Sequence, residues 1–448
     1  MKKLFGTDGV RGVVNRELLP ETALKLGRAG AYVLTQELLH APKIILGKDT
    51  RRSGDMLEAA LTAGLCSLGA YVYHAGVIPT PAVAHLVRKY GFDAGVMITA
   101  SHNPMEDNGI KFFNADGCKL PDATEDEIER LYYGGETEIP RPEGEAIGIR
   151  REANDAERDY IDYLISTAPG LSLEGMKIAL DCANGAVSWF APELFKRLNA
   201  EACVINAEPD GANINAGCGS THIGALKDFM RVTRCEIGFA FDGDGDRVLC
   251  VDDTNEVVEG DVILAICGAD LHETGKSGAV VTTAMSNIGL KKMCRERGID
   301  FYETAVGDRY VIEKMLEGGH ALGGEESGHI IFLEHNTTGD GLLTCLQLLS
   351  IVKRNGKTLS RLKSVMEKLP MILVNANVPN ERKREWRANP KIKSCFDEIE
   401  SALNDDGRIF VRPSGTEPLV RVMIEGPDES KIKEWANELA VLIESELS

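Results

Sequence analysis

Short apolar runs separated by segments of helical period recur along most of the chain. Runs such as Lys43–Gly47 and Gly95–Ile98 end at polar or turn-forming residues, which is typical of buried strands. Between them, Asp55–Leu68 and Pro81–Tyr90 space their apolar residues three to four positions apart, which predicts helices. The pattern therefore predicts strands and helices in alternation, as in an α/β fold.

The same order of elements returns twice further along the chain, which predicts three similar α/β domains with mixed sheets. In each copy, the loop that follows the last strand of the pattern carries reactive side chains. Equivalent loops of three similar domains can face one shared cleft. The later copies comprise the strands Lys177–Asp181, Ala202–Asn206, Ile237–Phe241, Ala279–Thr283, Ile299–Tyr302 and Ile330–Leu333 and the helices Val187–Leu198, Ile223–Val232, Gly289–Arg297 and Arg309–Leu316.

The rhythm changes after about Pro370, where a strand, a helix, two strands and a final helix predict a small α+β domain. We therefore expect four domains, at residues 1–150, 151–255, 256–368 and 369–448. The elements of the last domain are Ile372–Val378, Ile392–Leu403, Arg408–Val411, Leu419–Ile424 and a helix from Ser430 to the end.

Composition and charge limit the cell compartment and the classes of partner that we expect for this protein. The chain has 448 residues, no apolar run of about 18 residues and no signal-peptide pattern at its start, so we expect a cytoplasmic protein without a membrane span. Its 11 cysteines form no C-x-x-C pair, which favours reduced thiols. The net charge of −19 argues against binding to nucleic acid or to a membrane surface. A small anionic substrate would need local cations, and Arg11 in a glycine-punctuated loop is one candidate.

The loop after Gly95–Ile98 holds Ser101, followed by His102, and Lys111 comes ten residues after the serine. Serine is a weak nucleophile without help, and neither a G-x-S-x-G elbow nor an S-x-x-K pair supplies that help here. A turn serine is the alternative. His102 could orient the loop or move a proton. Lys111 could neutralise a phosphate, or act as an acid or base if its pKa were lowered.

A second loop, Asp242–Arg247, alternates aspartate with glycine and turns three carboxylates onto one short arc. Such an arc suits a cation that prefers oxygen ligands. An EF-hand is excluded because its sixth and twelfth positions would be Arg247 and Asp253, and because both flanks have the pattern of strands. Asp242, Asp244 and Asp246 therefore predict a Mg²⁺ site, and a serine near such a cation suggests phosphoryl transfer.

Two further loops carry polar side chains and glycines. The loop Arg412–Glu417 joins a guanidinium, hydroxyls and exposed backbone, which are the donors needed to hold a phosphate dianion. A connecting turn is the alternative there. The loop Gly323–His329 contains Glu325, Ser327 and His329, between two apolar runs.

Together these loops resemble the α-D-phosphohexomutase superfamily, and the resemblance covers nearly the whole chain. It rests on Gly6–Gly12, Thr99–Pro104, Asp242–Arg247, Gly324–His329 and Arg412–Pro418. The resemblance implies a fourth domain like the TATA-binding protein, with all four domains around a central cleft. It also implies a homodimer.

The resemblance also assigns roles. Ser101 would be phosphorylated and would share Mg²⁺ with Asp242, Asp244 and Asp246. Arg11, His102, Lys111 and Arg247 would surround the transferring phosphoryl group, with Lys111 as the preferred acid/base. The substrate would be bound by Glu325, Ser327, His329, Arg412, Ser414, Gly415 and Thr416.

The activity that the resemblance implies is a phosphate shift on a hexose. The phosphoserine would convert glucosamine 6-phosphate into a 1,6-bisphosphate, which turns end for end and returns its 6-phosphoryl group to Ser101. The product that leaves would be glucosamine 1-phosphate, a precursor of UDP-N-acetylglucosamine and the cell wall. Glucosamine 1,6-bisphosphate or another hexose 1,6-bisphosphate would act as activator. Glu326 and Thr99 depart from the commonest pattern of the family, and neither should stop phosphoryl transfer. Because of Glu326, a neutral hexose, as in phosphomannomutases and phosphoglucomutases, is the alternative substrate. An inactive sugar-phosphate-binding protein and a Mg²⁺-dependent phosphatase are rivals of other classes.

Overall fold

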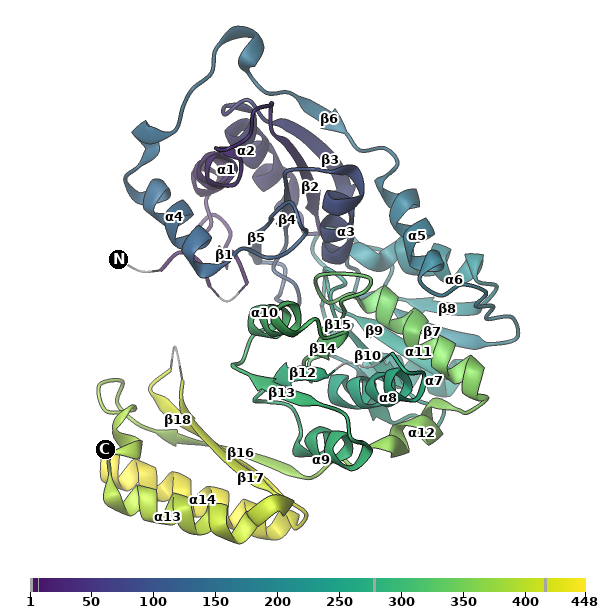
Figure 1. Cartoon of the computed structure of the whole chain (residues 1–448), viewed down its shortest axis with the longest axis vertical. Helices are drawn as coiled ribbons and strands as arrows, with labels where there is room; N and C mark the ends of the chain where they lie inside the picture. The colour runs from purple at the N-terminus through teal and green to yellow at the C-terminus, as the bar shows by residue number, and fades with distance from the viewer. Residues whose placement is uncertain (1–2, 7, 277–278, 415–416) are drawn as a thin grey trace. The chain divides into compact units, whose positions relative to one another are not determined.

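The computed structural model describes residues 3–6, 8–276, 279–414 and 417–448. These residues form two compact units, which Figure 1 shows coloured along the chain. The first unit contains Met1–Met285 and Ile299–Ser364, and the second contains Ser286–Gly298 and Val365–Ser448. The first unit holds three mixed sheets, and the second holds one antiparallel sheet.

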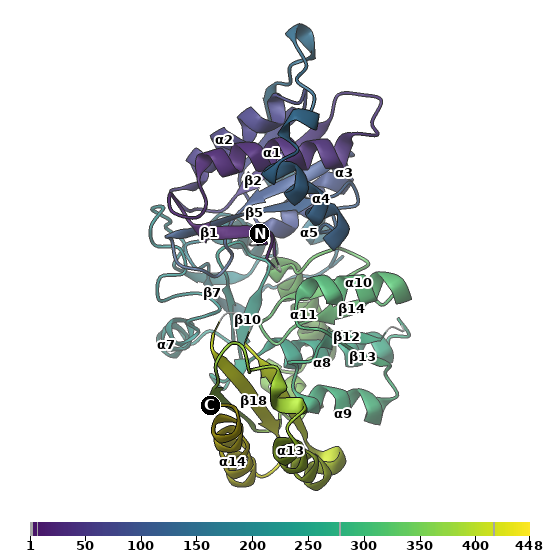
Figure 2. The ribbon, with the colours of Figure 1, turned by 90° about the vertical axis from the view of Figure 1, so that its left-hand side faces the viewer.

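The first sheet has the strand order β1-β5-β4-β2-β3-β6. Its central strands β2 and β4 are buried on both faces, which explains their continuous apolar runs. Helices α1 and α2 pack against each other on one side of the sheet (Figure 2), and α3 packs against β2 and β4. The elements are β1 (Val10–Val13), α1 (Pro20–Thr35), β2 (Lys43–Lys48), α2 (Gly54–Cys66), β3 (Tyr71–Val77), α3 (Thr80–Tyr90), β4 (Ala94–Ile98), β5 (Asp107–Phe113), α4 (Asp122–Tyr133) and β6 (Arg150–Glu152).

Helices α1 and α2 approach closely because a glycine lies at their contact. A Cβ atom at Gly64 would collide with the backbone carbonyl of Leu24. We expect Gly64→Ala to lower the free energy of unfolding by about 1–3 kcal/mol, since backbone cannot move aside as a side chain can. Denaturant titration measures this change. Gly224→Ala is the matched control, because a Cβ at that position meets no atom within 4 Å. Equal stability of the two variants would contradict the prediction.

The second sheet has the order β11-β10-β9-β7-β8 and the third the order β13-β12-β14-β15. In each, parallel strands occupy the positions that β2, β3 and β4 occupy in the first sheet. The elements are α5 (Ala156–Ser166), β7 (Lys177–Asp181), α6 (Phe190–Arg197), β8 (Glu201–Ile205), α7 (Gly224–Thr233), β9 (Ile237–Phe241), β10 (Val248–Val251), β11 (Val257–Val258), α8 (Gly260–Glu273), β12 (Val280–Thr283), β13 (Phe301–Thr304), α10 (Asp308–Gly318), β14 (Leu322–Gly324), β15 (Ile330–Phe332), α11 (Gly341–Asn355) and α12 (Leu359–Leu362).

The predicted fold class, three α/β domains followed by an α+β domain, is confirmed, with local differences. The helix predicted at Val187–Leu198 begins as a 3-10 turn at Ala186–Ser188 and becomes α-helical only from Phe190. The strand predicted at Ile299–Tyr302 lies at Phe301–Thr304 instead, because Phe301 is the first residue paired with β12. The predicted boundaries at residues 150, 255 and 368 remain predictions.

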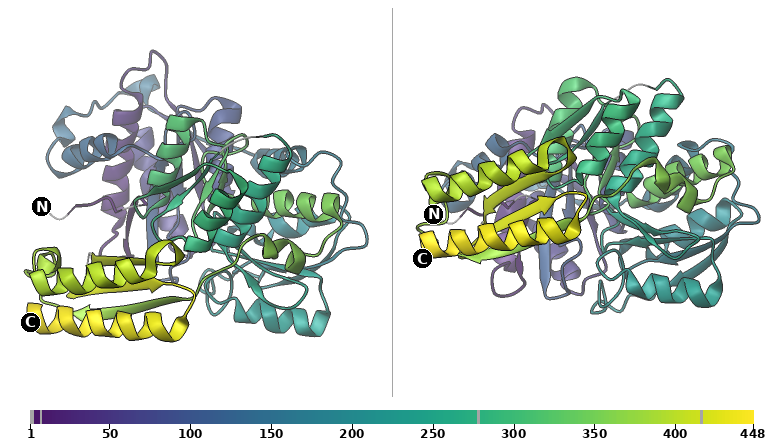
Figure 3. Two further views of the ribbon diagram at one scale, coloured as in Figure 1. Left: turned by 60° about the horizontal axis from the view of Figure 1, so that its bottom comes forward. Right: turned by 90° about the horizontal axis from the view of Figure 1, so that it is seen from below.

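The second unit consists of a three-stranded antiparallel sheet, order β16-β18-β17, with two long helices on one face. Figure 3 shows these helices, α13 and α14, running alongside each other. Helix α9 also belongs to this unit, where the Asn287 side chain donates to Glu425 on β18 at 2.9 Å. The elements are α9 (Ile288–Arg297), β16 (Met371–Asn377), α13 (Pro390–Leu403), β17 (Arg408–Pro413), β18 (Leu419–Glu425) and α14 (Glu429–Leu447).

The predicted order of strand, helix, two strands and helix in this unit is confirmed. Within the described part of the chain, no helix combines the length and the apolarity that a membrane span needs.

Candidate active site

Three loops from three sheets meet in the first unit. Each begins where a parallel strand of its sheet ends: Thr99 follows β4, Asp242 follows β9 and Glu325 follows β14. A strand ends there because the next residues bring glycine, serine or aspartate in place of the apolar run. The carboxyl ends of such strands are the usual place for ligand sites in α/β sheets. The polar loops of the three α/β domains therefore lie close together in the first unit.

Ser101 lies directly against the aspartate loop. Its hydroxyl donates to Oδ2 of Asp242 at 2.6 Å, and the residue has a positive φ of 53°. The close approach depends on Gly243, because a Cβ at that position would lie 2.6 Å from the carbonyl oxygen of Ser101. The sequence placed the serine and the aspartates on separate loops, and the structure brings them into hydrogen-bond contact.

The three aspartates form a cluster whose open oxygens fit a metal ion. One carboxylate oxygen from each of Asp242, Asp244 and Asp246 lies within 4.8 Å of the others, and all three side chains are buried. Among the described residues, Oδ1 of Asp244 and Oδ1 of Asp246 have no hydrogen-bond partner. A buried acceptor without a partner is costly, and a hard cation would satisfy both oxygens. The donor set therefore fits Mg²⁺.

Repulsion within the cluster points the same way. Burial and the neighbouring carboxylates of Asp246 and Asp244 raise the pKa of Asp242 well above its usual range. A divalent cation would offset this repulsion.

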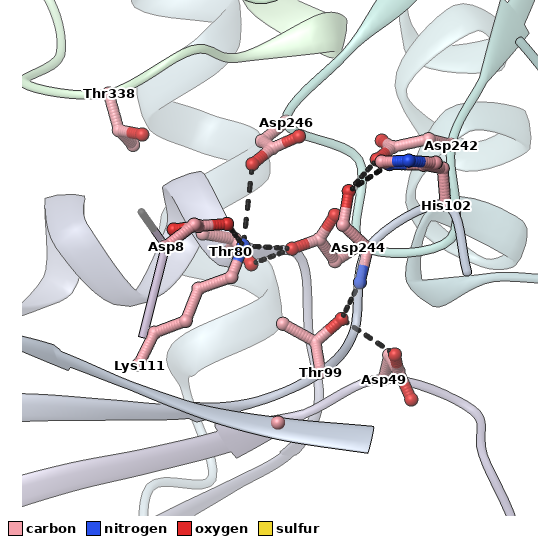
Figure 4. A network of polar contacts seen from close by, with 12 residues as sticks. Asp8, Asp49, Thr80, Thr99, His102, Lys111, Asp242, Asp244, Asp246 and Thr338 are labelled. Atoms are coloured by element: carbon pink, nitrogen blue, oxygen red, sulfur yellow. Dashed lines mark hydrogen bonds and ion pairs between the residues drawn. The ribbon is translucent and has the colours of Figure 1, made fainter. Parts of the chain in front are cut away.

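Asp244 is held from the other side by the first sheet's domain. Its Oδ2 accepts from the Thr80 hydroxyl at 2.6 Å and from the Lys111 ammonium at 2.9 Å, as Figure 4 shows. The amide of Thr80 also donates to the backbone carbonyl of Asp244 at 2.9 Å. These donors occupy one carboxylate oxygen and leave the other open.

Lys111 is buried among carboxylates. Its ammonium lies 2.9 Å from Asp8, 2.9 Å from Asp244 and 3.6 Å from Asp246. Burial alone would lower its pKa, but the carboxylates of Asp244, Asp8 and Asp246 outweigh burial and raise it. The lowered pKa that would make Lys111 a base is therefore not seen in this arrangement. A charge-neutralising role agrees with the geometry.

His102 takes part through its Nδ1 atom. Arg247 approaches this atom at 3.1 Å, and the Ser101 hydroxyl lies 3.4 Å from it. Because a guanidinium can only donate, Nδ1 accepts in the contact with Arg247. Burial, then the charges of Arg247 and Arg11, lower the pKa of His102 to about 4. Of the two roles left open by the sequence, this geometry favours orienting the loop.

A chain of charged side chains continues from Lys111 to the third domain. Asp8 pairs with Arg11, Lys111 and Lys119, and Lys119 also pairs with Asp308 at the start of α10. Asp308 in turn lies 3.3 Å from Nε2 of His329. The sequence analysis quoted the segment of Asp8, Gly6–Gly12, without giving the residue a role, and it quoted no segment that contains Asp308. A glycine next to each aspartate was the available signal.

The loop carrying Glu325, Ser327 and His329 is joined to the aspartate loop by backbone. Val248 donates its amide to the carbonyl of Gly328 at 3.1 Å, next to a bridge between Arg247 and His329. The buried Ser327 hydroxyl has no partner among the described residues. Burial raises the pKa of Glu325, although His329 and Arg247 oppose that effect.

The predicted phosphate loop belongs to the second unit. Arg412 is the last residue but one of β17 and lies opposite Arg421 of β18, and the buried Ser414 comes directly after the strand. Two guanidiniums on directly opposed positions repel each other, so an anion would stabilise the pair. Gly415 and Thr416 lie outside the described residues.

Four family models match the chain in succession. They describe the domains I, II, III and the C-terminal domain of phosphoglucomutase/phosphomannomutase, over residues 2–138, 158–255, 259–369 and 373–442. Together they span most of the sequence.

Relatives and solved structures agree with these models. The chain is 54% identical over 450 residues to a phosphoglucosamine mutase of Ruminiclostridium cellulolyticum, covering 100% of both chains, and 55% identical over 447 residues to one of Clostridium perfringens, covering 99% of both. A phosphoglucomutase/phosphomannomutase family protein from Burkholderia thailandensis shares the fold with a TM-score of 0.84 at 24% identity, over 99% of this chain and 98% of that one.

An Aspergillus fumigatus N-acetylphosphoglucosamine mutase in complex with GlcNAc-6P and magnesium shares the fold more distantly. Its TM-score is 0.66 at 19% identity, over 96% of this chain and 100% of that one. The four domain models and the full-length relatives lead to one conclusion. The chain belongs to the phosphoglucomutase/phosphomannomutase family of α-D-phosphohexomutases and is an isomerase of the mutase type.

Proposed function

We propose that the chain interconverts glucosamine 6-phosphate and glucosamine 1-phosphate through a phosphorylated Ser101. The observation that carries the proposal is the 2.6 Å contact between the Ser101 hydroxyl and the aspartate cluster. Full-length relatives named phosphoglucosamine mutase support the choice of sugar.

The residues around Ser101 define the transfer step. In the forward direction, the bond between the serine oxygen and phosphorus breaks and a bond from the free sugar hydroxyl to phosphorus forms. The sugar hydroxyl gives up its proton and the serine oxygen takes one. We propose that the Lys111 ammonium, whose raised pKa keeps it protonated, first donates a proton to the serine oxygen and then receives the proton of the sugar hydroxyl. Arg11 and Arg247 neutralise charge on the moving group. Most of the rate enhancement over the uncatalysed transfer then comes from positioning of the reacting groups and neutralisation of their charge.

Asp242, Asp244 and Asp246 would hold Mg²⁺ together with an oxygen of the phosphoserine. When bound, the ion withdraws charge from the phosphoryl oxygens. Support comes from the partnerless oxygens of Asp244 and Asp246 and from the magnesium named with the Aspergillus relative.

The remaining predicted residues would hold the sugar. Glu325, Ser327 and His329 would bind its hydroxyls, and Arg412, Ser414, Gly415 and Thr416 would hold the phosphate that is not reacting. The 1,6-bisphosphate must turn end for end between the transfer from Ser101 and the transfer back to it. The site that holds the non-reacting phosphate must therefore accept either phosphate of the bisphosphate. A hexose 1,6-bisphosphate would therefore act as activator, by phosphorylating Ser101.

A substrate panel tests the proposal. Turnover of glucosamine 6-phosphate, glucose 6-phosphate and mannose 6-phosphate is compared in the presence of Mg²⁺ and a catalytic amount of glucose 1,6-bisphosphate. We expect kcat/KM to be highest for the amino sugar by at least about tenfold, because one well-placed polar contact is worth at least that much. Preference for a neutral hexose would select phosphomannomutase/phosphoglucomutase instead. Release of inorganic phosphate as main product would indicate a phosphatase.

The proposed setting is the cytoplasm, and the proposed assembly is a homodimer. The cytoplasmic setting rests on the cysteine pattern of the sequence, and the dimer rests on the family resemblance. Fractionation of cells would locate the protein, and light scattering of the purified chain would give its mass in solution. A monomeric mass at working concentration would contradict the dimer.

A further inference from the structure

Arg51 is a fully buried arginine that makes no contact with the aspartate cluster or with the charged chain from Lys111 to His329. It follows β2 by three residues, and its side chain is 0% exposed. Its Nε donates to Oδ2 of Asp49 at 2.9 Å. The rest of the guanidinium faces away from this carboxylate, toward the loop that carries Ser101.

That loop is held through its carbonyl oxygens. Nη2 of Arg51 donates to the carbonyls of Ser101 at 3.0 Å and Asn103 at 2.8 Å. Nη1 donates to the carbonyls of Pro104 and Asp107, the latter at 3.0 Å. All five N–H groups of the guanidinium are therefore used, four of them on the Ser101 loop and the first residue of β5, Asp107.

The same loop is held from the second domain and from the strand before it. The side-chain amide of Asn215 donates to the carbonyls of Ser101 at 2.9 Å and Asn103 at 3.1 Å. The amide of Ser101 donates to the Thr99 hydroxyl at 2.9 Å, and that hydroxyl donates to Asp49 at 2.7 Å. Arg51 and Asp49 thus fix the peptides on both sides of Ser101.

Ser101 has an unfavourable backbone conformation, which the hydrogen bonds from Arg51 and Asn215 stabilise. Its φ of 53° lies in the left-handed region, which a non-glycine residue keeps only when its surroundings impose it. Four carbonyls pointing at one guanidinium supply that constraint. A lysine keeps the charge but has three donors on a flexible stem, so it cannot reproduce the planar fork.

We propose that Arg51 is a positioning residue for phosphoryl transfer, which fixes the Ser101 loop so that the hydroxyl faces the aspartate cluster. The inference rests on the proposed role of Ser101. Arg51 touches neither the serine side chain nor the aspartate cluster, so it acts only through the backbone that it holds.

The kinetic test uses Arg51→Lys, with Arg52→Lys as matched control because Arg52 is exposed next door. With a sugar phosphate and catalytic glucose 1,6-bisphosphate, we expect kcat of Arg51→Lys to fall about 100-fold, since small misplacement of a reacting group has effects of that size. KM should change by less than about threefold, because ground-state binding uses other loops. A kcat within twofold of the wild type, an effect on KM alone, or an equal loss in Arg52→Lys would overturn the proposal.

A second readout needs no activity. Hydrogen exchange is followed in the peptide that contains the amides of Ser101, Asn103 and Asp107, each of which donates a hydrogen bond in this loop. We expect faster exchange there in Arg51→Lys and wild-type exchange in Arg52→Lys. Unchanged exchange would refute the fixation of the Ser101 loop by Arg51. If the wild type showed no mutase activity while exchange still rose in Arg51→Lys, this fixation would be supported and the proposed function would fail.

Asn215→Ala covers the case in which Arg51→Lys does not fold, as judged by its thermal unfolding. This variant removes one donor from the same two carbonyls without leaving a buried charge. It should raise exchange at Asn103 and lower kcat by about tenfold. Wild-type values for both would overturn the proposal.

Discussion

Ser101→Ala is expected to lower mutase turnover by at least about 1,000-fold, as loss of a nucleophile does in other covalent enzymes. The reason is geometric: the Ser101 hydroxyl donates to Asp242 of the aspartate cluster at 2.6 Å, so it lies where a group next to a bound cation would react. Steady-state turnover of glucosamine 6-phosphate with catalytic glucose 1,6-bisphosphate measures the loss. Intact mass spectrometry should show a phosphoryl group on the wild type and none on the variant.

Ser166→Ala is the control for this prediction, because Ser166 is exposed at the end of α5 and only caps a local carbonyl. It should retain both turnover and the phosphoryl group. Ser101→Ala should also unfold near the wild-type temperature, since a small hydroxyl is lost and no large cavity forms. Residual turnover above a tenth of the wild-type value, in a variant free of the phosphoryl group, would contradict a phosphoserine mechanism.

The sequence predicted those parts of the site that follow from chain-local patterns. The strands that end at Ile98 and Phe241 are each followed by small and polar residues, a pattern that predicts a loop. The residue types in that loop indicate its chemistry. Repetition of the pattern then places similar loops at equivalent strand ends. The contact between Ser101 and Asp242 follows from this repetition, although no local pattern shows the distance.

Elements whose packing hides the usual periodicity could not be predicted in this way. Helix α8 is buried along almost its whole length, so it lacks the polar face that marks an amphipathic helix. Helix α1 contains Gly27 and Gly30, which look unfavourable in a helix. Both glycines are explained only by neighbours distant in sequence: a Cβ at Gly30 would lie 2.6 Å from the ring of Phe112.

The charged chain from Lys111 to His329 was also beyond sequence analysis. Asp8, Lys119 and Asp308 come from three separate segments, and each is an ordinary surface residue type. Only the fold shows that Lys119 is shared between Asp8 and Asp308 and that all three are shielded from solvent. Arg51 is a similar case, because its partners are backbone carbonyls that leave no mark in a sequence.

Asp244→Asn is expected to weaken Mg²⁺ binding by at least about tenfold, the lower end of what altered metal surroundings cost, and to reduce turnover with it. Asp244 Oδ2 is occupied by Thr80 and Lys111, so its free Oδ1 is the atom offered to the ion. An amide keeps an oxygen but removes the negative charge that attracts a divalent cation. Calorimetric titration of the protein with an unphosphorylated Ser101 measures the affinity for Mg²⁺ in the absence of substrate.

Two matched variants separate metal binding from disturbance of Lys111. Asp228→Asn changes an exposed aspartate in the same domain, which pairs with Arg231, and should leave the affinity unchanged. Thr80→Val keeps all three carboxylates but removes a donor to Asp244, so its affinity should lie between those of the wild type and Asp244→Asn. Chelation should abolish wild-type turnover, and added Mg²⁺ should restore it. If Asp244→Asn bound Mg²⁺ as tightly as Asp228→Asn yet lost turnover, the carboxylate would act through Lys111, and the aspartate cluster would not be the metal site.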